Sequence, residues 1–152
     1  MGIEIERKFL VTGDGWRVGT PSLLRQAYLN LDKNRTVRLR IADDTAFLTI
    51  KGKTSGFSRA EFEYEIPLSD AIEMFELCEK PHIEKKRWKV AQGDLTWEID
   101  EFFGDNEGLI VSEIELTSED QDFDKPEWVS VEVTSEKKYS NSNLIKKPFK
   151  SW

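Results

Sequence analysis

The chain has 152 residues, of which 38% are hydrophobic, 11% aromatic and 34% charged. This is a usual size for one domain with its own core, and the hydrophobic and aromatic content is too high for a disordered chain. The formal net charge of −7 argues against nucleic-acid or anionic-membrane partners, since both prefer a basic surface. We therefore expect residues 1–152 to form a single domain with no nucleic acid and no membrane among its partners.

Cysteine content and hydropathy restrict the protein class further. Cys78 is the only cysteine, which excludes an internal disulfide and a cysteine-based zinc site. No apolar run approaches the length needed to span a membrane, and the N-terminal residues lack the apolar stretch of a secretory signal. A cytoplasmic protein is the expectation.

Short strands separated by turn signals dominate the predicted secondary structure. Strands are expected over residues 2–11, 23–31, 36–42, 45–53 and 58–67, and again over 83–91, 95–103 and 109–117. Asp43-Asp44 and Gln92-Gly-Asp94 are typical of tight hairpin turns. These eight strands follow one another in hairpin order, so we expect a mainly antiparallel sheet.

Helices are expected in two places. Over residues 70–80, Ala71, Ile72, Met74, Phe75 and Cys78 form one apolar face. Ser69 or Asp70 can cap the start of this helix, and Pro81 ends it. The last part of the chain, residues 119–152, is expected to form short helices around 128–133 and a basic helix over 135–146.

Charged residues occupy every second position in seven segments. These are Glu4/Glu6/Lys8, Arg38/Arg40, Lys51/Lys53, Glu61/Glu63/Glu65, Lys85/Arg87, Glu98/Asp100 and Glu113/Glu115. Alternate side chains of a strand point to opposite faces, so each set lies on one face and the largely apolar residues between lie on the other. For a single strand, a solvated outer face is the ordinary explanation. A solvated face gains little from sorting charges by sign, whereas a tunnel that holds metal ions against a polyanion requires it.

The predicted fold is a mainly β (α+β) protein built on a closed eight-stranded antiparallel β-barrel. Closure removes the exposed sheet edges, and the helices at 70–80 and 119–146 can cover the apolar outer faces. A barrel of about eight strands has room inside for one small ligand. The charged groups inside it must be paired, hydrated or bound to a ligand, because burying unpaired charge is very costly.

The interior chemistry favours phosphate and a hard cation. Carboxylates without thiolates or suitable histidines suit Mg²⁺ or Mn²⁺. Arginine gives bidentate contacts to phosphate, and lysine adds a compact charge. A metal ion facing a basic clamp is the usual arrangement for phosphoryl transfer.

Several motifs resemble those of one family. Glu4-Ile-Glu6-Arg-Lys8 resembles the ExExK signature that opens the CYTH proteins, also called triphosphate tunnel metalloenzymes. Further matching segments follow in the family's order: Arg38-Leu-Arg40, Lys51-Gly-Lys53, Glu61-Phe-Glu63, Glu84-Lys85-Lys-Arg87, Glu98-Ile-Asp100 and Glu113-Ile-Glu115. The resemblance implies a tunnel in which a triphosphate is hydrolysed or cyclised with a divalent metal ion.

The resemblance also implies roles for individual residues. Metal ligands or water-orienting carboxylates are expected at Glu4, Glu6, Glu61, Glu63, Asp100, Glu113 and Glu115. Triphosphate contacts are expected at Lys8, Arg38, Arg40, Lys51, Lys53, Lys85, Arg87 and Lys138. Catalytic roles are expected for Glu4, Glu6, Lys8, Lys85 and Tyr28, the last at a tunnel mouth, although an aromatic that only fills a gap explains Tyr28 equally well. Lys138 belongs to Lys137-Lys-Tyr139-Ser-Asn141, which resembles a C-terminal plug helix that closes one tunnel end. Arg59 could contact the ligand or form a surface salt bridge, and Glu98 could lie at a solvated strand end.

Three functions are compatible with these residues. The first is hydrolysis of inorganic tripolyphosphate, favoured because the short chain has no insert to hold a nucleoside. The second is chemistry on an organic triphosphate, as in an adenylate cyclase or a thiamine or nucleoside triphosphatase. The third is a non-catalytic polyphosphate-binding module. The sequence is compatible with a monomer or a homodimer.

Overall fold

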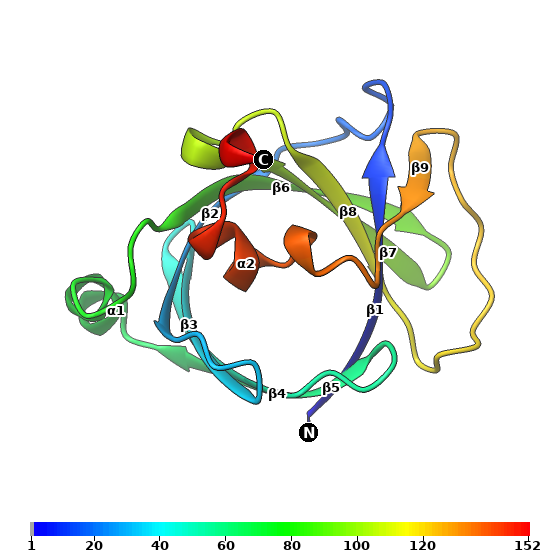
Figure 1. Cartoon of the computed structure of the whole chain (residues 1–152). Helices are drawn as coiled ribbons and strands as arrows, with labels where there is room; N and C mark the ends of the chain where they lie inside the picture. The colour runs from blue at the N-terminus through cyan, green and yellow to red at the C-terminus, as the bar shows by residue number, and fades with distance from the viewer. Residues whose placement is uncertain (1) are drawn as a thin grey trace.

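Nine strands form one antiparallel sheet that closes on itself (Figure 1). The computed structural model describes residues 2–152. Its strands are β1 (Ile3–Val11), β2 (Ser22–Asn30), β3 (Arg35–Ala42), β4 (Thr45–Gly52), β5 (Ser58–Ile66), β6 (Ile83–Gln92), β7 (Leu95–Phe102), β8 (Ile110–Glu115) and β9 (Val129–Glu132). The neighbour order is β5-β4-β3-β2-β6-β7-β8-β1, and pairing of β1 with β5 completes the barrel. The predicted eight-stranded barrel is therefore confirmed, with β9 as one additional strand.

Strand β1 makes the closure because it pairs with three other strands. One of its edges pairs with β8 from Glu6 to Leu10. The other edge pairs with β5 over Ile3–Ile5 and then with β9 at Phe9 and Val11. The guanidinium of Arg7 holds β9 in place through two hydrogen bonds of 2.6 and 2.8 Å to the Glu132 carboxylate.

The alternation of side chains gives the barrel a polar inside and an apolar outside. On β3, Arg38 and Arg40 line an internal cavity, whereas Leu39 and Ile41 point outward and are buried under other elements. The hydrophobic contacts that normally fill a protein centre therefore lie around the barrel wall.

Two hydrophobic clusters cover opposite sides of the barrel (Figure 1). The helix α1 (Leu68–Phe75) packs on β3 and β4 through Ala71 and Phe75. On the other side, the loop that follows β1 and the loop that precedes β9 cover β1, β7 and β8. The buried members of this second cluster are Phe9, Trp16, Trp97, Ile99, Ile114, Leu116 and Trp128.

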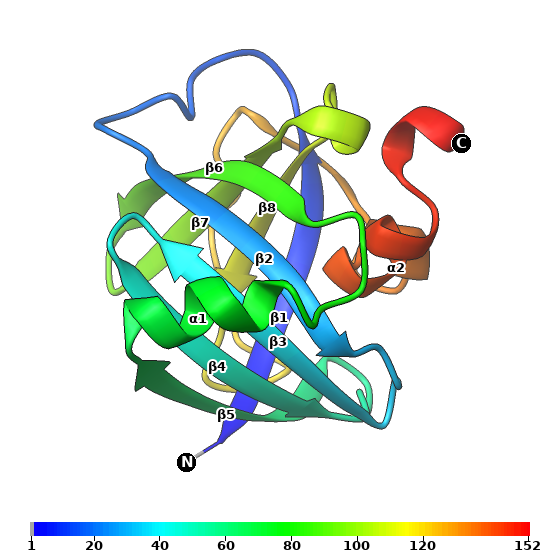
Figure 2. The same cartoon turned by 90° about the vertical axis from the view of Figure 1, so that its left-hand side faces the viewer.

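A third cluster closes one end of the barrel. Leu144 and Ile145 of α2 (Asn141–Lys146) pack against an apolar layer of barrel side chains, and α2 lies across that end (Figures 1 and 2). The layer consists of Tyr28, Ile83, Phe102, Leu109 and Val111. This agrees with the expected plug, and it brings a C-terminal segment next to the barrel interior.

The predicted helices need three corrections. Residues 128–133 contain the strand β9 instead of a helix, because Val129 and Val131 are β-branched and alternate along an available edge of β1. Residues 135–146 do not form one helix. A 3₁₀ turn at Lys137–Tyr139 is followed by Ser140, whose backbone is extended. The Ser140 hydroxyl accepts a hydrogen bond from the backbone amide of Asn143 and so caps the start of α2.

The third correction concerns α1, which begins at Leu68 with Pro67 as its N-cap and has no side-chain cap. The chain beyond its last residue tightens into i→i−3 hydrogen bonds, from Glu76 to Glu73, Leu77 to Met74 and Cys78 to Phe75, so the α-helix ends before residue 80. None of the helices within residues 2–152 has the length and hydropathy needed to cross a membrane.

Replacement of Phe9 tests the position of the main core outside the barrel. Phe9 is fully buried and makes edge-on contacts with Trp97 and Phe123. We expect Phe9→Ala to lower the free energy of unfolding by about 3–5 kcal/mol, because it leaves a cavity among aromatic side chains. The measurement is urea denaturation followed by circular dichroism. The control is Ile72→Ala on the exposed side of α1, which should change stability by less than about 0.5 kcal/mol. Equal losses in both variants would contradict the proposed core.

Candidate active site

An internal cavity of about 230 Å³, here called the tunnel, lies inside the barrel and has charged walls. Every one of the eight barrel strands contributes to it, together with the segment that leads into α2. Its lining residues are Glu4, Glu6, Lys8, Tyr28, Thr36, Arg38, Arg40, Lys51, Arg59, Glu61, Glu63, Arg87, Glu98, Glu113, Glu115, Ser140, Asn141 and Ser142.

Twelve of the sixteen residues singled out from the sequence line this tunnel, and four lie elsewhere. Lys53 is exposed in the turn after β4. Lys138 is exposed outside the barrel, with its ammonium 4.5 Å from the centre of the Trp152 ring. Lys85 and Asp100 are buried in the barrel interior but do not line the tunnel.

Three arginines form the basic side of the tunnel. Arg38 donates from Nη2 to Thr49 (3.2 Å) and Glu63 (3.4 Å), whereas its buried Nε has no partner. The Nε of Arg40 donates to the neutral oxygen of Gln26 (3.1 Å). Burial, together with the positive charges of Arg38 and Arg87, lowers the pKa of Arg40 to about 9. Positive charge and hydrogen-bond donors therefore exceed what the protein itself pairs, which favours an anion.

The third arginine is held by a buried ion-pair cluster behind the tunnel wall. Asp100 accepts from Arg87 Nε (2.8 Å) and Nη2 (3.0 Å) and from the Lys85 ammonium (2.7 Å). Burial would raise the pKa of Asp100, but these two cations hold it well below its usual range. Burial also lowers the pKa of Lys85 to about 7, with Arg87 and Arg40 adding to the effect and Asp100 opposing it. The cluster fixes the Arg87 guanidinium and occupies both Asp100 oxygens.

The acidic side of the tunnel is organised around Lys51. Its ammonium lies 3.0 and 3.1 Å from the two Glu4 carboxylate oxygens and 3.4 Å from Glu61. Burial raises the pKa of Glu4, with Lys51 opposing and Glu61 adding to the shift. Burial and the charges of Glu4 and Glu61 likewise raise the pKa of Glu115. Negative charge on this side exceeds what Lys51 neutralises.

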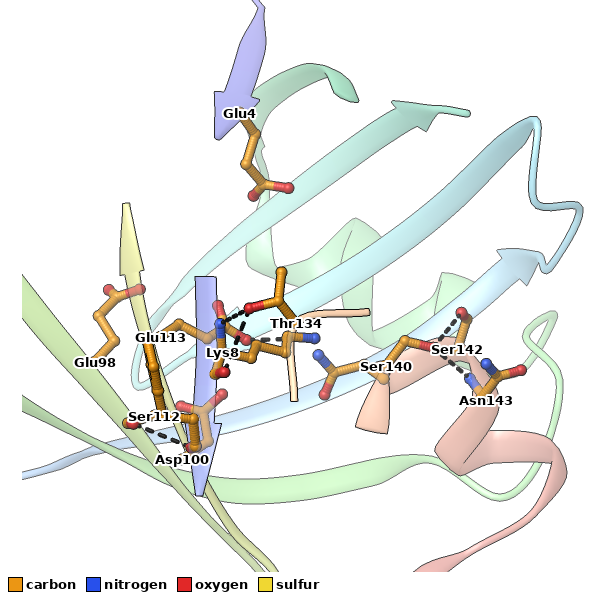
Figure 3. Close-up of polar contacts among 12 residues, drawn as sticks. Glu4, Lys8, Glu98, Asp100, Ser112, Glu113, Thr134, Ser140, Ser142 and Asn143 are labelled. Carbon is orange, nitrogen blue, oxygen red and sulfur yellow. Dashed lines mark hydrogen bonds and ion pairs between the residues drawn. The ribbon is translucent and has the colours of Figure 1, made fainter. Parts of the chain in front are cut away.

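A second acidic group lies deeper, between β1 and β8. The Lys8 ammonium is 3.7 Å from the Glu113 carboxylate. Beside them, the Thr134 hydroxyl accepts a hydrogen bond from the backbone amide of Lys8 (Figure 3). Burial and the charges of Glu113 and Glu4 raise the pKa of Glu6 well above its usual range. The pKa of Glu113 is lowered to about 2, because Lys8, Arg87 and a hydrogen bond with Glu6 outweigh its burial.

The acidic side has the donors that a hard divalent cation requires. Its acidic side chains offer carboxylate oxygens, and the raised pKa values of Glu4, Glu6 and Glu115 come in part from the negative charges of neighbouring carboxylates, which a bound cation would offset. Within residues 2–152, no three acidic, histidine or cysteine side chains converge on one point in the arrangement seen here. Lys51 lies between Glu4 and Glu61, where its ammonium supplies the positive charge.

Four lining residues were not predicted from sequence. Thr36 belongs to β3, one alternation before Arg38, so the two-residue period could have identified it. Ser140, Asn141 and Ser142 reach the tunnel from the C-terminal segment, and the Asn141 side-chain oxygen accepts a hydrogen bond from Lys85 (3.2 Å). A local sequence pattern contains no signal for such a contact. Arg59 and Glu98, whose positions the sequence left open, both line the tunnel.

Comparisons with known proteins agree on the family. The CYTH domain matches residues 2–149. The chain is 50% identical to an inorganic triphosphatase of Acetivibrio thermocellus, over 100% of this chain and 99% of that protein. It is 38% identical to an inorganic triphosphatase of Nitrosomonas europaea, over 93% and 95% of the two chains. The crystal structure of the inorganic triphosphatase NE1496 superposes with a TM-score of 0.66 at 32% identity, covering 93% of this chain and 96% of that one. With a charged tunnel inside an eight-stranded barrel and these relatives over nearly its whole length, the chain belongs to the CYTH domain family.

Proposed function

We propose that this protein hydrolyses inorganic tripolyphosphate inside the tunnel with the help of a divalent cation, Mg²⁺ or Mn²⁺. The observation that carries the proposal is the division of one enclosed cavity into two sides. The incompletely paired guanidiniums of Arg38 and Arg40, with Arg87 beside them, face a group of carboxylates whose repulsion is only partly neutralised. A triphosphate bound to the first side and a cation bound to the second would satisfy both.

The composition of the tunnel wall favours an inorganic substrate. Tyr28 is the only aromatic residue among those that line the tunnel, and it belongs to the apolar layer at the closed end. Proteins that hold a nucleobase commonly stack it on aromatic side chains, and the tunnel offers no such platform beyond Tyr28. The two curated relatives described above, both inorganic triphosphatases, point in the same direction.

The proposed reaction assigns different tasks to the two sides. Arg38, Arg40 and Arg87 bind the phosphate oxygens and neutralise charge as a phosphoanhydride bond breaks. Glu4, Glu6, Glu61, Glu113 and Glu115 are the residues that would hold the cation and orient the attacking water. When bound, a divalent cation neutralises phosphoryl oxygens and makes phosphorus more electrophilic. Water adds its oxygen to a terminal phosphorus, the leaving chain departs as pyrophosphate, and orthophosphate is the second product.

Phosphate release is the first test of this function. We expect tripolyphosphate to be hydrolysed with Mg²⁺ or Mn²⁺, more efficiently than ATP, GTP or thiamine triphosphate, because the tunnel lacks a site for an organic group. Excess EDTA should abolish turnover, and added metal should restore it. Full turnover in chelator would contradict the metal-dependent reaction, and binding without any phosphate release would indicate a binding module.

Arginine variants test the basic side. We expect Arg40→Ala and Arg87→Ala each to raise KM by an amount equivalent to about 1.5–3 kcal/mol, the usual contribution of a charge-assisted hydrogen bond. Lys53→Ala is the matched control, because it removes one positive charge from the exposed turn after β4 and should leave kcat/KM unchanged. The measurement is steady-state phosphate release by folded variants. If Lys53→Ala lost as much as the arginine variants, overall charge and not tunnel geometry would explain the effect.

Glutamine variants of β1 separate catalysis from binding. Glu4→Gln and Glu6→Gln keep the side-chain shape but remove the negative charge that would hold a cation. We expect both to bind tripolyphosphate in calorimetry, because the arginines are intact, and to lose at least ~100-fold in kcat. Glu65→Gln is the control, since Glu65 is exposed on β5 and does not line the tunnel. Normal turnover in both β1 variants would remove these carboxylates from the mechanism.

A further inference from the structure

The C-terminal residues carry a charge opposite to that of the rest of the chain. Residues 137–152 contain five of the 22 basic residues and none of the 29 acidic ones. Their side chains therefore contribute +5, whereas residues 1–136, with 17 basic and 29 acidic residues, contribute −12. An otherwise acidic chain thus has a basic C-terminal region.

This basic region forms a surface groove of about 960 Å³, here called the C-terminal lysine groove. Its ammonium groups come from Lys137, Lys138, Lys146 and Lys147, joined by Lys33 from the turn between β2 and β3. No acidic side chain of residues 2–152 lines the groove, and none of these lysines forms an ion pair within that range. Five exposed like charges repel one another, so the arrangement favours a ligand with several negative charges.

A second cavity lies next to both this groove and the tunnel. This vestibule, about 350 Å³, lies between the turn that follows β4 and the segment that leads into α2. Lys137 lines both the groove and the vestibule, and Ser140 and Lys8 line both the vestibule and the tunnel. Figure 2 shows α2 and the β2–β3 turn at the same end of the barrel. The vestibule therefore adjoins the surface groove on one side and the tunnel on the other.

We propose that the C-terminal lysine groove is a second, non-catalytic binding site for linear condensed phosphates longer than tripolyphosphate. The inference rests on the proposed function of the tunnel for the identity of the ligand, although the groove itself does not. A condensed phosphate carries one negative charge or more on every unit, so a chain with its end in the tunnel has further charges to place outside it. Lys137 and then the remaining groove lysines receive them. Nucleic acid fits less well, because its bases would find no aromatic stacking platform in the tunnel beyond Tyr28.

The test compares two triple variants with equal loss of charge. The groove variant is Lys33→Gln/Lys146→Gln/Lys147→Gln, whose side chains lie outside the tunnel and the vestibule. The control is Lys80→Gln/Lys86→Gln/Lys125→Gln, three exposed lysines elsewhere on the protein. Calorimetry with long-chain polyphosphate in EDTA should show binding weakened about tenfold or more in the groove variant, with a smaller salt dependence, and nearly unchanged in the control. Turnover of tripolyphosphate with metal should be the same in both variants as in the wild type.

Three results would overturn the proposal: wild-type polyphosphate affinity in the groove variant, equal losses in the groove variant and the control, or tighter binding of single-stranded RNA than of polyphosphate in the groove. Wild-type affinity in the groove variant would show that the groove is not a binding site. Equal losses in both variants would show that net charge explains the effect. Tighter binding of RNA would show that the ligand is a nucleic acid. Failure of the proposed function remains distinguishable. If the wild type releases no phosphate from tripolyphosphate, the tunnel assignment fails, whereas the groove is judged from the binding of polyphosphate alone, including in Arg40→Ala.

Discussion

The structure depends on the pairing of charges that are buried inside a barrel. Asp100 and Lys85 are almost completely inaccessible, and either one alone would be very unfavourable away from water. Asp100 is stable because Lys85 and Arg87 of β6 donate to it, and Lys85 is stable because Asp100 of β7 and Asn141 of α2 accept from it. Because charged residues occupy the middle of the barrel, two of the three hydrophobic clusters lie outside the wall, under α1 and under the long loops, and the third lies at the end covered by α2. The charge that remains incompletely paired, at Arg38 and Arg40 and around Glu4, is the part available to ligands.

The strands and their orientation could be predicted from the sequence because alternation is a local property. Charged and apolar residues alternate along each strand, and this alternation predicts both the strand and the face that points inward. At Val129 and Val131 the alternation is present but short, so the expected helix over residues 128–133 is wrong and β9 lies there. Ser140 separates the 3₁₀ turn from α2 by its extended backbone, a break that the basic composition of the segment does not reveal.

The site was less predictable, because alternation defines a face but neither its limits nor its depth. Lys53 continues the pattern of Lys51, yet β4 ends at Gly52 and the alternation has no meaning in the turn beyond it. Lys85, like Arg87, points into the barrel. It lies deeper, however, where its ammonium donates to Asp100 and Asn141 and does not line the tunnel. Contacts of this kind depend on how distant segments pack, and only the folded chain contains that information.

The pairing of β1 has a consequence for the order of folding. Its partners in β8 and β9 lie near the other end of the chain, and Arg7 is separated from Glu132 by 125 residues. Contacts between such distant residues require a long loop to close, which is slow and occurs late. During synthesis, β1 leaves the ribosome first and must wait for these strands. Since Glu4, Glu6 and Lys8 all lie on β1, assembly of the reaction site and completion of the fold are one event.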